Sequence, residues 1–312
     1  MIRAGGIAAA VVMLLLTLFL FPPISTTGDL GLCLPSPNQW ELPRFAGWLL
    51  NAVFIFLSAA VMAATNKRFN FLQEADPIMS LSLLILLGAG CVSSATLSTS
   101  TILLLANAAG LYLLLSTYEE RNASREFFML ATIPAFGAMV QYAFLLLVPL
   151  HIFGGLMMKS FRIREFIAYI LGLLAPYWIV VGLGIIPPEA FRLPDTLTVI
   201  STAEVQNDLF LTLLATGLMA LIGIVLAFYN GVRLFTRNSR LRGMHMTFNA
   251  MGILAVAAVI FDFSNFVAYF GLLALWVAIE TATMLWLYNA RNPGWAVGIL
   301  LLLFLPFFIL EI

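Results

Sequence analysis

Four ionisable residues of this 312-residue chain stand where they could carry chemistry. Glu280 and His151 lie within long apolar runs, whereas Asp29 and Glu41 lie in the more polar segment after the first apolar run. An ionisable side chain inside a membrane span costs roughly 2.5–3.5 kcal/mol on insertion scales, so it is by default a hypothesis of function. Glu280 and His151 are therefore candidates for a proton or substrate site, and Asp29 and Glu41 are candidates for catalytic acids at a membrane surface.

Glu280 and His151 each have a structural interpretation as well. A protonated Glu280, or a Glu280 paired with an arginine of the 233–242 loop, would hold helices together. His151 follows Pro149, which frees a backbone carbonyl, and precedes two glycines that let another helix approach closely. A neutral His151 bonded to a neighbouring helix fits that context, and structural roles are the commoner ones for such residues.

Sequence motifs of high specificity are absent. The chain has no P-loop, no glycine-rich dinucleotide turn, no His-Glu-x-x-His and no Cys-x-x-Cys. Its two His and two Cys residues are far apart in the sequence. We therefore expect no dedicated metal site and no cofactor, and the sequence assigns no catalytic residue beyond the four candidates.

The composition indicates a membrane protein. The chain is 62% hydrophobic and 10% charged, with a mean hydropathy of +1.03, whereas an ordinary soluble domain is about 25% charged. A net charge of zero argues against binding to nucleic acid, which needs a basic face. Since no polar stretch is long enough to fold separately, residues 1–312 are expected to form a single transmembrane domain.

Eleven apolar segments are candidates for membrane-spanning helices, each of which needs about 20 apolar residues. The first lacks a small-x-small cleavage site, so it is interpreted as an uncleaved span. The sequence therefore predicts an all-α, polytopic bundle of about eleven transmembrane helices. The segments are residues 4–21, 45–64, 77–94, 98–117, 127–141, 142–158, 166–186, 208–234, 246–261, 265–288 and 293–310.

The topology depends on residues 127–158, a stretch too long for one ordinary span and short for two. If it forms two helices, thirteen of the fifteen Lys and Arg residues fall on one side, and only Arg44 and Arg192 oppose them. If it forms one, the split is six against nine. Cytoplasmic loops carry the Lys/Arg excess, which favours two helices, a cytoplasmic N-terminus and an external C-terminus. Two short spans and a re-entrant hairpin both remain open.

A cluster of basic residues lies between the eighth and ninth segments. Its members could bind anionic lipid headgroups, although the topology signal alone also accounts for them. They are Arg233, Arg237, Arg240, Arg242 and His245.

The two cysteines would face the same side of the membrane in this topology. Cys33 falls in the first outer loop, and Cys91 falls about 20 Å along a helix that begins on the cytoplasmic side. Both thiols would face the oxidising side of a bacterial inner membrane, where a disulfide can form. Two unpaired cysteines with unrelated roles are the alternative.

Four short stretches carry a family resemblance. They are Thr65-Asn66-Lys67-Arg68-Phe69-Asn70-Phe71, Phe161-Arg162-Ile163-Arg164-Glu165-Phe166, Leu171-Gly172-Leu173-Leu174-Ala175-Pro176-Tyr177-Trp178 and Phe304-Leu305-Pro306-Phe307-Phe308. With the order of the spans, they resemble an uncharacterised family of multi-spanning inner-membrane proteins common in Bacteroidota. The resemblance implies a multi-pass protein of a bacterial inner membrane and carries no activity.

Three functions are compatible with the sequence. A component or partner in an envelope-associated complex is favoured, because no catalytic constellation is evident. A polytopic glycosyltransferase-like enzyme using a polyprenyl-phosphate-linked sugar would place its acid in the first outer loop, where Asp29 and Glu41 stand. A secondary transporter would use Glu280 and His151 as coupling groups. The partners implied are the lipid bilayer, other inner-membrane proteins or a polyprenyl lipid, and no nucleic acid.

Overall fold

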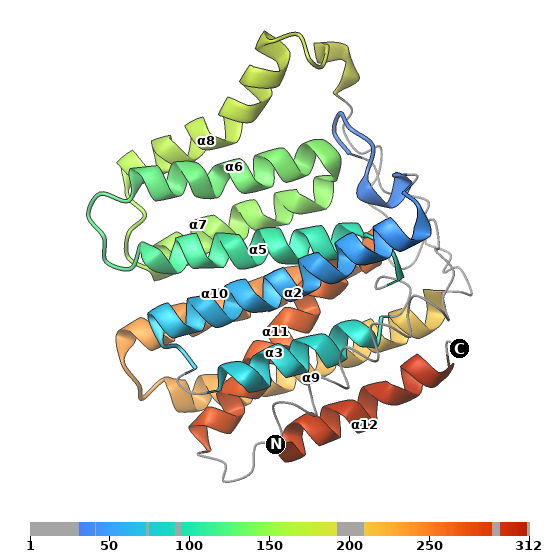
Figure 1. The fold of residues 1–312 in the computed structure, drawn as a ribbon. Helices are drawn as coiled ribbons and strands as arrows, with labels where there is room; N and C mark the ends of the chain where they lie inside the picture. Colours follow the sequence, from blue (N-terminus) through green and yellow to red (C-terminus); the bar gives the residue numbers. More distant parts are fainter. Residues whose placement is uncertain are drawn as a thin grey trace.

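The computed structural model describes residues 31–40, 42–72, 75–90, 95–191, 209–288 and 294–310. Over these ranges the chain forms ten α-helices, a few short 3-10 helices and no β-strand (Figure 1). The α-helices are α2 (Arg44–Phe69), α3 (Asp76–Gly88), α5 (Thr99–Ser116), α6 (Ser124–Val140), α7 (Leu147–Met157), α8 (Ile163–Gly182), α9 (Phe210–Leu234), α10 (Ser239–Phe261), α11 (Phe266–Leu287) and α12 (Gly294–Leu310).

Six of the described helices are long and apolar enough to cross a membrane. They are Arg44–Phe69, Thr99–Ser116, Ile163–Gly182, Phe210–Leu234, Ser239–Phe261 and Phe263–Leu287. The prediction of an all-α, membrane-type bundle is confirmed, and each of the ten helices falls on one apolar segment of the sequence. The first expected span, residues 4–21, lies outside the described residues, so the total of eleven stays a prediction.

Residues 127–158 form two helices. Helix α6 ends at Val140, Gln141 adopts an extended backbone, and the 3-10 helix η2 (Tyr142–Leu146) leads directly into α7. Helix α6 packs against both η2 and α7 (Figure 1). A Cβ atom on Gly137 would overlap the Phe144 ring, so glycine is needed for this close return. The predicted division into two helices is confirmed.

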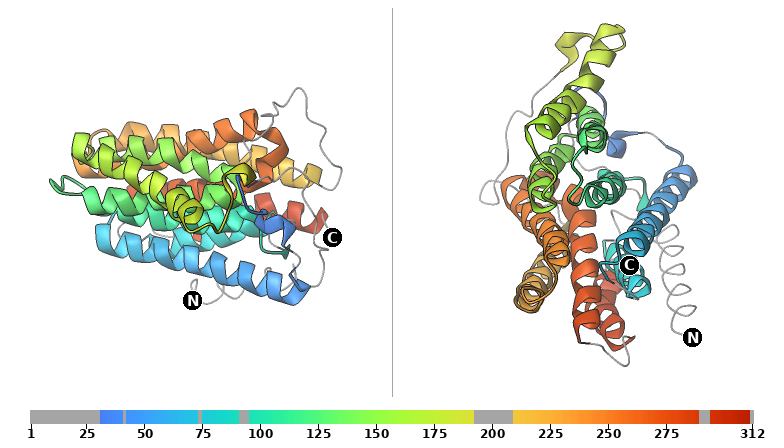
Figure 2. Two further views of the ribbon diagram at one scale, coloured as in Figure 1. Left: turned by 90° about the horizontal axis from the view of Figure 1, so that it is seen from above. Right: turned by 90° about the vertical axis from the view of Figure 1, so that its left-hand side faces the viewer.

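Helix α11 lies at the centre of the bundle. It packs against α9, α3, α10 and α5, and the views in Figures 1 and 2 show it surrounded by other helices. In the most apolar stretch of Phe263–Leu287, which contains α11, 83% of the residues are buried. The corresponding stretch of α8 (Ile163–Gly182) has 22% of its residues buried. A helix that is apolar on every side is suited to such a position.

Trp276 fixes the central helix against two neighbours. Its fully buried indole lies between Gly223 of α9 and Gly252 of α10. A Cβ atom on Gly252 would overlap the ring, and one on Gly223 would lie 2.5 Å from Cζ3. The indole Nε1 also donates a hydrogen bond to Asn249 Oδ1 at 3.3 Å. The two glycines thus form the slot that the indole fills.

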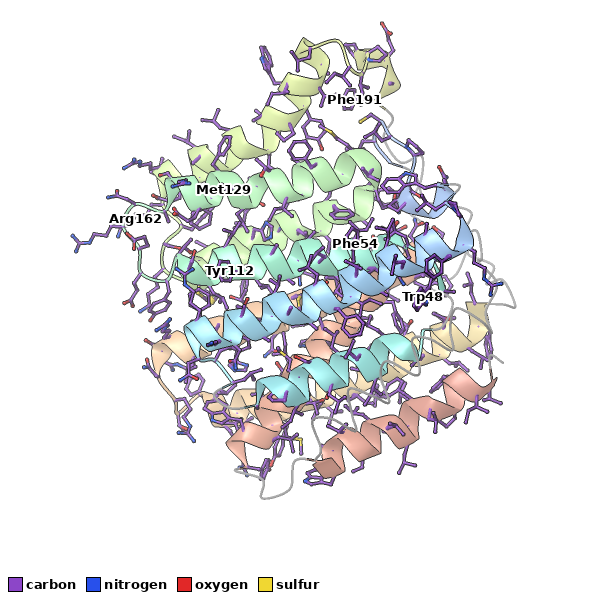
Figure 3. All side chains as sticks on the ribbon, in the orientation of Figure 1. Trp48, Phe54, Tyr112, Met129, Arg162 and Phe191 are labelled. Carbon is purple, nitrogen blue, oxygen red and sulfur yellow. The ribbon has the colours of Figure 1, made fainter. Side chains whose placement is uncertain are left out.

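Most basic side chains gather at one end of the bundle, which we call the basic end. Figure 3 labels Arg162 and Tyr112 near this end and Trp48 and Phe191 near the other. Arg44 begins α2 at the opposite end, and it is the exception among the twelve Lys and Arg residues in the described ranges. The basic end holds Lys67, Arg68, Arg121, Arg125, Lys159, Arg162, Arg164, Arg233, Arg237, Arg240 and Arg242.

Side-chain contacts join the loops of the basic end. Lys159 Nζ lies 3.1 Å from Glu119 Oε1, and this hydrogen bond holds the pKa of Glu119 below its usual value. Tyr118 OH lies 3.4 Å from Ser239 Oγ, which joins the end of α5 to the start of α10. The structure therefore brings together the loops that the charge pattern predicted to share one side.

Candidate functional site

Glu280 is fully buried on α11, where its partner is an amide on α9. Asn230 Nδ2 donates to Glu280 Oε2 at 2.7 Å and to the Glu280 backbone carbonyl at 2.8 Å. In the described part of the chain, Glu280 Oε1 and Asn230 Oδ1 have no hydrogen-bond partner. Glu280 thus joins α9 to α11 through Asn230 and not through an arginine of the 233–242 loop.

The position of Asn230 follows from the spacing of buried residues on α9. Asn230 comes seven residues after Gly223, which is about two helical turns, so both lie on the face that meets α11. Gly223 makes room for Trp276, and the helices then approach closely enough for Asn230 to reach Glu280. Sequence reasoning missed Asn230. One signal could have indicated it: Asn230 carries the one side-chain amide of the apolar segment 208–234, and it lies two helical turns after Gly223.

His151 is buried where α7 meets α5 and α8. Its Nδ1 lies 3.3 Å from Tyr169 OH of α8, with the two rings edge to face. Its Nε2 has no hydrogen-bond partner among the described residues. A Cβ atom on Gly110 of α5 would lie 2.9 Å from that Nε2, so the imidazole occupies space left by glycine. His151 is placed as an interhelical contact.

The structure does not bring Glu280 and His151 into one site. Glu280 bonds to α9, whereas His151 of α7 bonds to α8, and Figure 1 shows α10 between α8 and α9. The other two candidates, Asp29 and Glu41, lie outside the described residues. A single intramembrane site using both Glu280 and His151 therefore has no geometric support.

A buried carboxylate network lies at the opposite end from the basic loops. Asp262 follows α10 and accepts hydrogen bonds from Tyr142 OH at 2.8 Å, Tyr269 OH at 2.7 Å and Asn265 Nδ2 at 2.9 Å. Asn265 Nδ2 also bonds to Tyr142 OH. This group could not be predicted from the sequence, because nothing local indicates that Tyr142 lies beside a residue 120 positions later. The network joins the α6–α7 turn to the α10–α11 turn.

Cys33 lies at the same end, against the last residues of α6. Its backbone amide donates to the Met139 carbonyl at 3.2 Å, and the neighbouring Leu32 amide donates to Ala138 at 3.1 Å. Partial burial raises the pKa of the Cys33 thiol. Cys91 lies outside the described residues, so the Cys33–Cys91 disulfide stays a prediction.

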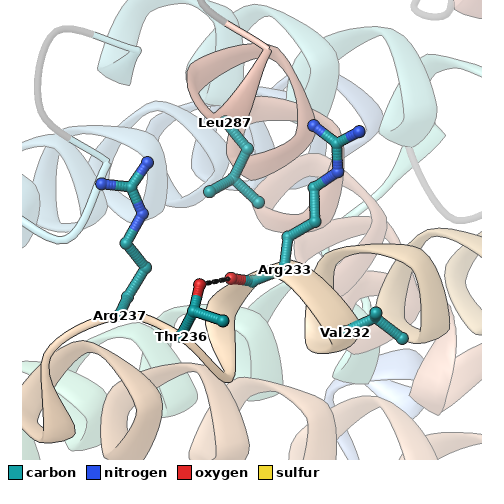
Figure 4. A pocket seen from close by; sticks show the side chains of 5 residues that line it. All are labelled: Val232, Arg233, Thr236, Arg237 and Leu287. Carbon is teal, nitrogen blue, oxygen red and sulfur yellow. Dashed lines mark hydrogen bonds between the residues drawn. The ribbon is translucent and has the colours of Figure 1, made fainter.

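A pocket of about 460 Å³ opens at the basic end, between the ends of α9 and α11. Figure 4 shows the guanidinium groups of Arg233 and Arg237 on two sides of the Leu287 side chain. Thr236 Oγ1 donates to the Arg233 carbonyl at 3.0 Å. The pocket is lined by Val232, Arg233, Thr236, Arg237 and Leu287.

Aromatic rings lie against both arginines of the pocket. Arg233 Cζ is 4.1 Å from the centre of the Tyr288 ring and 5.3 Å from that of Tyr229. These two tyrosine rings are stacked, with centres 5.4 Å apart and planes 7° from parallel. Arg237 Cζ is 5.9 Å from the Trp286 ring. Cations over ring faces are attracted by the ring quadrupole, which here restrains the guanidiniums beside the pocket.

Comparison with models of protein families, with curated proteins and with solved structures finds no match to this chain. Among the described residues, no group of three His, Cys, Asp or Glu side chains could hold a metal ion.

Proposed function

We propose that this chain is a multi-pass protein of a bacterial inner membrane that acts as a component of an envelope-associated complex. The supporting observation is the way α8 is attached to the bundle. Its main contact is with α6, and it stands at the top edge of the bundle in Figure 1 and in the right view of Figure 2. Family membership, as the resemblance implies it, is part of the same proposal.

Helix α8 is held by one narrow stripe of residues. The buried positions are Glu165, Tyr169, Gly172 and Pro176, which follow one another at steps of four, three and four. This spacing places them on a single face. A Cβ atom on Gly172 would overlap the Phe128 backbone carbonyl, so the contact with α6 is close along this stripe.

Most of the other residues of α8 are apolar and are exposed or only partly buried. Trp178 is 82% exposed, and apolar exposure continues past the helix end to Leu183 and Ile185, at 71% and 65%. Lipid chains can cover the middle of such a helix, but residues beyond its end reach the polar interface. Helices of another membrane protein would cover both regions, and we infer that such a partner docks on α8.

Photo-crosslinking tests this docking. With p-benzoylphenylalanine in place of Leu171 or Leu183, irradiation of intact cells is expected to give a discrete adduct of higher mass. Leu221 and Phe228 of α9 are matched controls, because they are 61% and 77% exposed on another side of the bundle. Protein adducts from α8 and only lipid adducts from α9 would support the proposal. Lipid adducts alone from both helices would contradict it.

The orientation of the chain follows from the basic end, which we place in the cytoplasm because cytoplasmic loops carry the Lys/Arg excess. This puts the N-terminus in the cytoplasm and the C-terminus outside. In a background without Cys33 and Cys91, an impermeant maleimide added to intact spheroplasts should label Ala190→Cys and not Arg240→Cys. Permeabilised spheroplasts should label both, as a control. Labelling of Arg240→Cys from outside would reverse the orientation.

One observation favours a secondary transporter as a second candidate. Glu280 is an ionisable group within a span, and its Oε1 has no partner among the described residues. Such a group can take up and release a proton. The glycosyltransferase-like alternative, with a polyprenyl lipid as its partner, depends on Asp29 and Glu41, which lie outside the described residues. It stays a prediction.

A further inference from the structure

We propose that the pocket between α9 and α11 binds the phosphate group of an anionic phospholipid. This site is independent of the partner docking on α8. It is built from two arginines, an apolar wall and a supporting layer of aromatic rings, and each part has a separate role in holding such a lipid.

The two arginines both line the pocket, one on each side of Leu287. Arg233 lies in the last turn of α9, and Arg237 lies in the turn that follows it, where its amide donates to the Leu234 carbonyl at 2.9 Å. Figure 4 shows both guanidiniums beside the same opening. A guanidinium offers a planar fork of N–H donors that matches phosphate oxygens. Each guanidinium can therefore donate hydrogen bonds to a phosphate group that enters the pocket.

Within the described ranges, no carboxylate neutralises the positive charge of the pocket. Among the described residues, no Asp or Glu oxygen lies within 4.0 Å of Arg233 or Arg237, and the ion pair of the basic end is Lys159 with Glu119. Residues 233–242 contain four arginines and no acidic residue. An anion entering the pocket would thus meet unpaired cations already restrained by Tyr288 and Trp286.

The apolar surroundings indicate a lipid as the source of the phosphate. Val232 and Leu287 line the pocket itself. Phe228 of α9 is 77% exposed and comes five residues before Arg233, and Phe235, which lies between the two arginines just after α9, is 69% exposed. A headgroup in the pocket could therefore extend its acyl chains along an apolar helix face into the bilayer. Free phosphate would make no use of that face.

Ligand-dependent melting of the purified protein in detergent tests the proposal. Phosphatidylglycerol, which is anionic, is expected to raise the Tm, and phosphatidylcholine is expected to raise it much less. The double variant Arg233→Gln/Arg237→Gln should bind phosphatidylglycerol about tenfold to thirtyfold more weakly, from the usual contribution of each basic residue at an anionic surface. Inorganic phosphate at the same concentration should leave the Tm unchanged.

The matched control is Arg121→Gln/Arg125→Gln, which removes the same charge from the same end and should keep wild-type binding. Equal loss in this control would show a general charge effect and overturn the site. An equal Tm increase with inorganic phosphate would show that free anion binds, and an equal increase with phosphatidylcholine would show that charge is irrelevant. Either result would overturn the proposal.

A lysine variant serves if the glutamine variant fails to fold. Arg233→Lys/Arg237→Lys keeps the positive charge and removes the planar guanidinium donors. This variant should bind the anionic lipid several-fold more weakly. Unchanged binding would show that the planar guanidinium donors are not needed.

Discussion

Gly252→Leu is expected to prevent the central helix from packing and to abolish most of the folded protein in detergent extracts. The slot for the Trp276 indole is formed by Gly252 and Gly223, and a first side-chain atom on Gly252 already overlaps the ring. Overpacking a tight core by an extra methylene costs about 1–3 kcal/mol, and leucine adds four carbons. Gly252→Ala should fold with a lower Tm. Fluorescence-detected size-exclusion chromatography and thermal melts measure both effects.

The control for this prediction is Gly217→Leu on α9. A Cβ atom on Gly217 has no atom within 4 Å, so the same substitution there should leave the Tm nearly unchanged. A second test uses the partner side chain, because neighbouring substitutions are not additive. In a Trp276→Leu background, Gly252→Ala should cost less than it does in the wild type. An unchanged Tm for Gly252→Leu would show that Trp276 does not occupy this slot.

The fold could be predicted from the sequence because its main signals are local or additive. Runs of apolar residues show where each helix lies, since a helix in a bilayer needs a minimum apolar length. The charge count then decided that residues 127–158 form a hairpin, a conclusion that apolar length alone could not give. The turn at Gln141 and Tyr142 agrees with that prediction.

The contacts between helices could not be predicted, because they depend on how each helix is rotated about its axis. Nearly every face of α11 is apolar, so no periodicity indicates that Trp276 points between α9 and α10. The same limit applies to Asp262, whose partner Tyr142 lies 120 residues earlier. The structure buries Asp262 to 3% exposure.

The candidate site was predicted in part. Glu280 stood out because an acid inside an apolar run is costly, yet its partner Asn230 did not. The sequence also indicated that the four arginines of residues 233–242 could bind anionic lipid headgroups. Only the relative placement of α9 and α11 shows that Arg233 and Arg237 line the pocket, while Arg240 lies over Tyr118.

Asn230→Leu is expected to be the most informative change at the α9–α11 contact. It removes the amide that donates to Glu280 Oε2, and so leaves a buried carboxyl group without that partner. A buried polar group left unpaired costs about 1–3 kcal/mol, and more if it is charged. The Tm should fall clearly. Thr216→Val is the control, because the Thr216 hydroxyl bonds only to the Thr212 carbonyl of its own helix, and its loss should cost much less.

Replacing both partners separates a structural role of Glu280 from a proton-carrying one. In Asn230→Leu/Glu280→Leu neither position carries a polar side chain that could be left unpaired, and such replacements are often neutral or stabilising, so the Tm should recover. Glu280→Gln should also melt near the wild type, because its new amide can donate to Asn230 Oδ1, which otherwise lacks a partner. A strain with the double leucine variant that grows like the wild type would make Glu280 purely structural. The opposite result is loss of growth with both Asn230→Leu/Glu280→Leu and Glu280→Gln while each protein is still folded in the membrane. Because both variants lack the Glu280 carboxyl group, that result would assign Glu280 to a proton or substrate path.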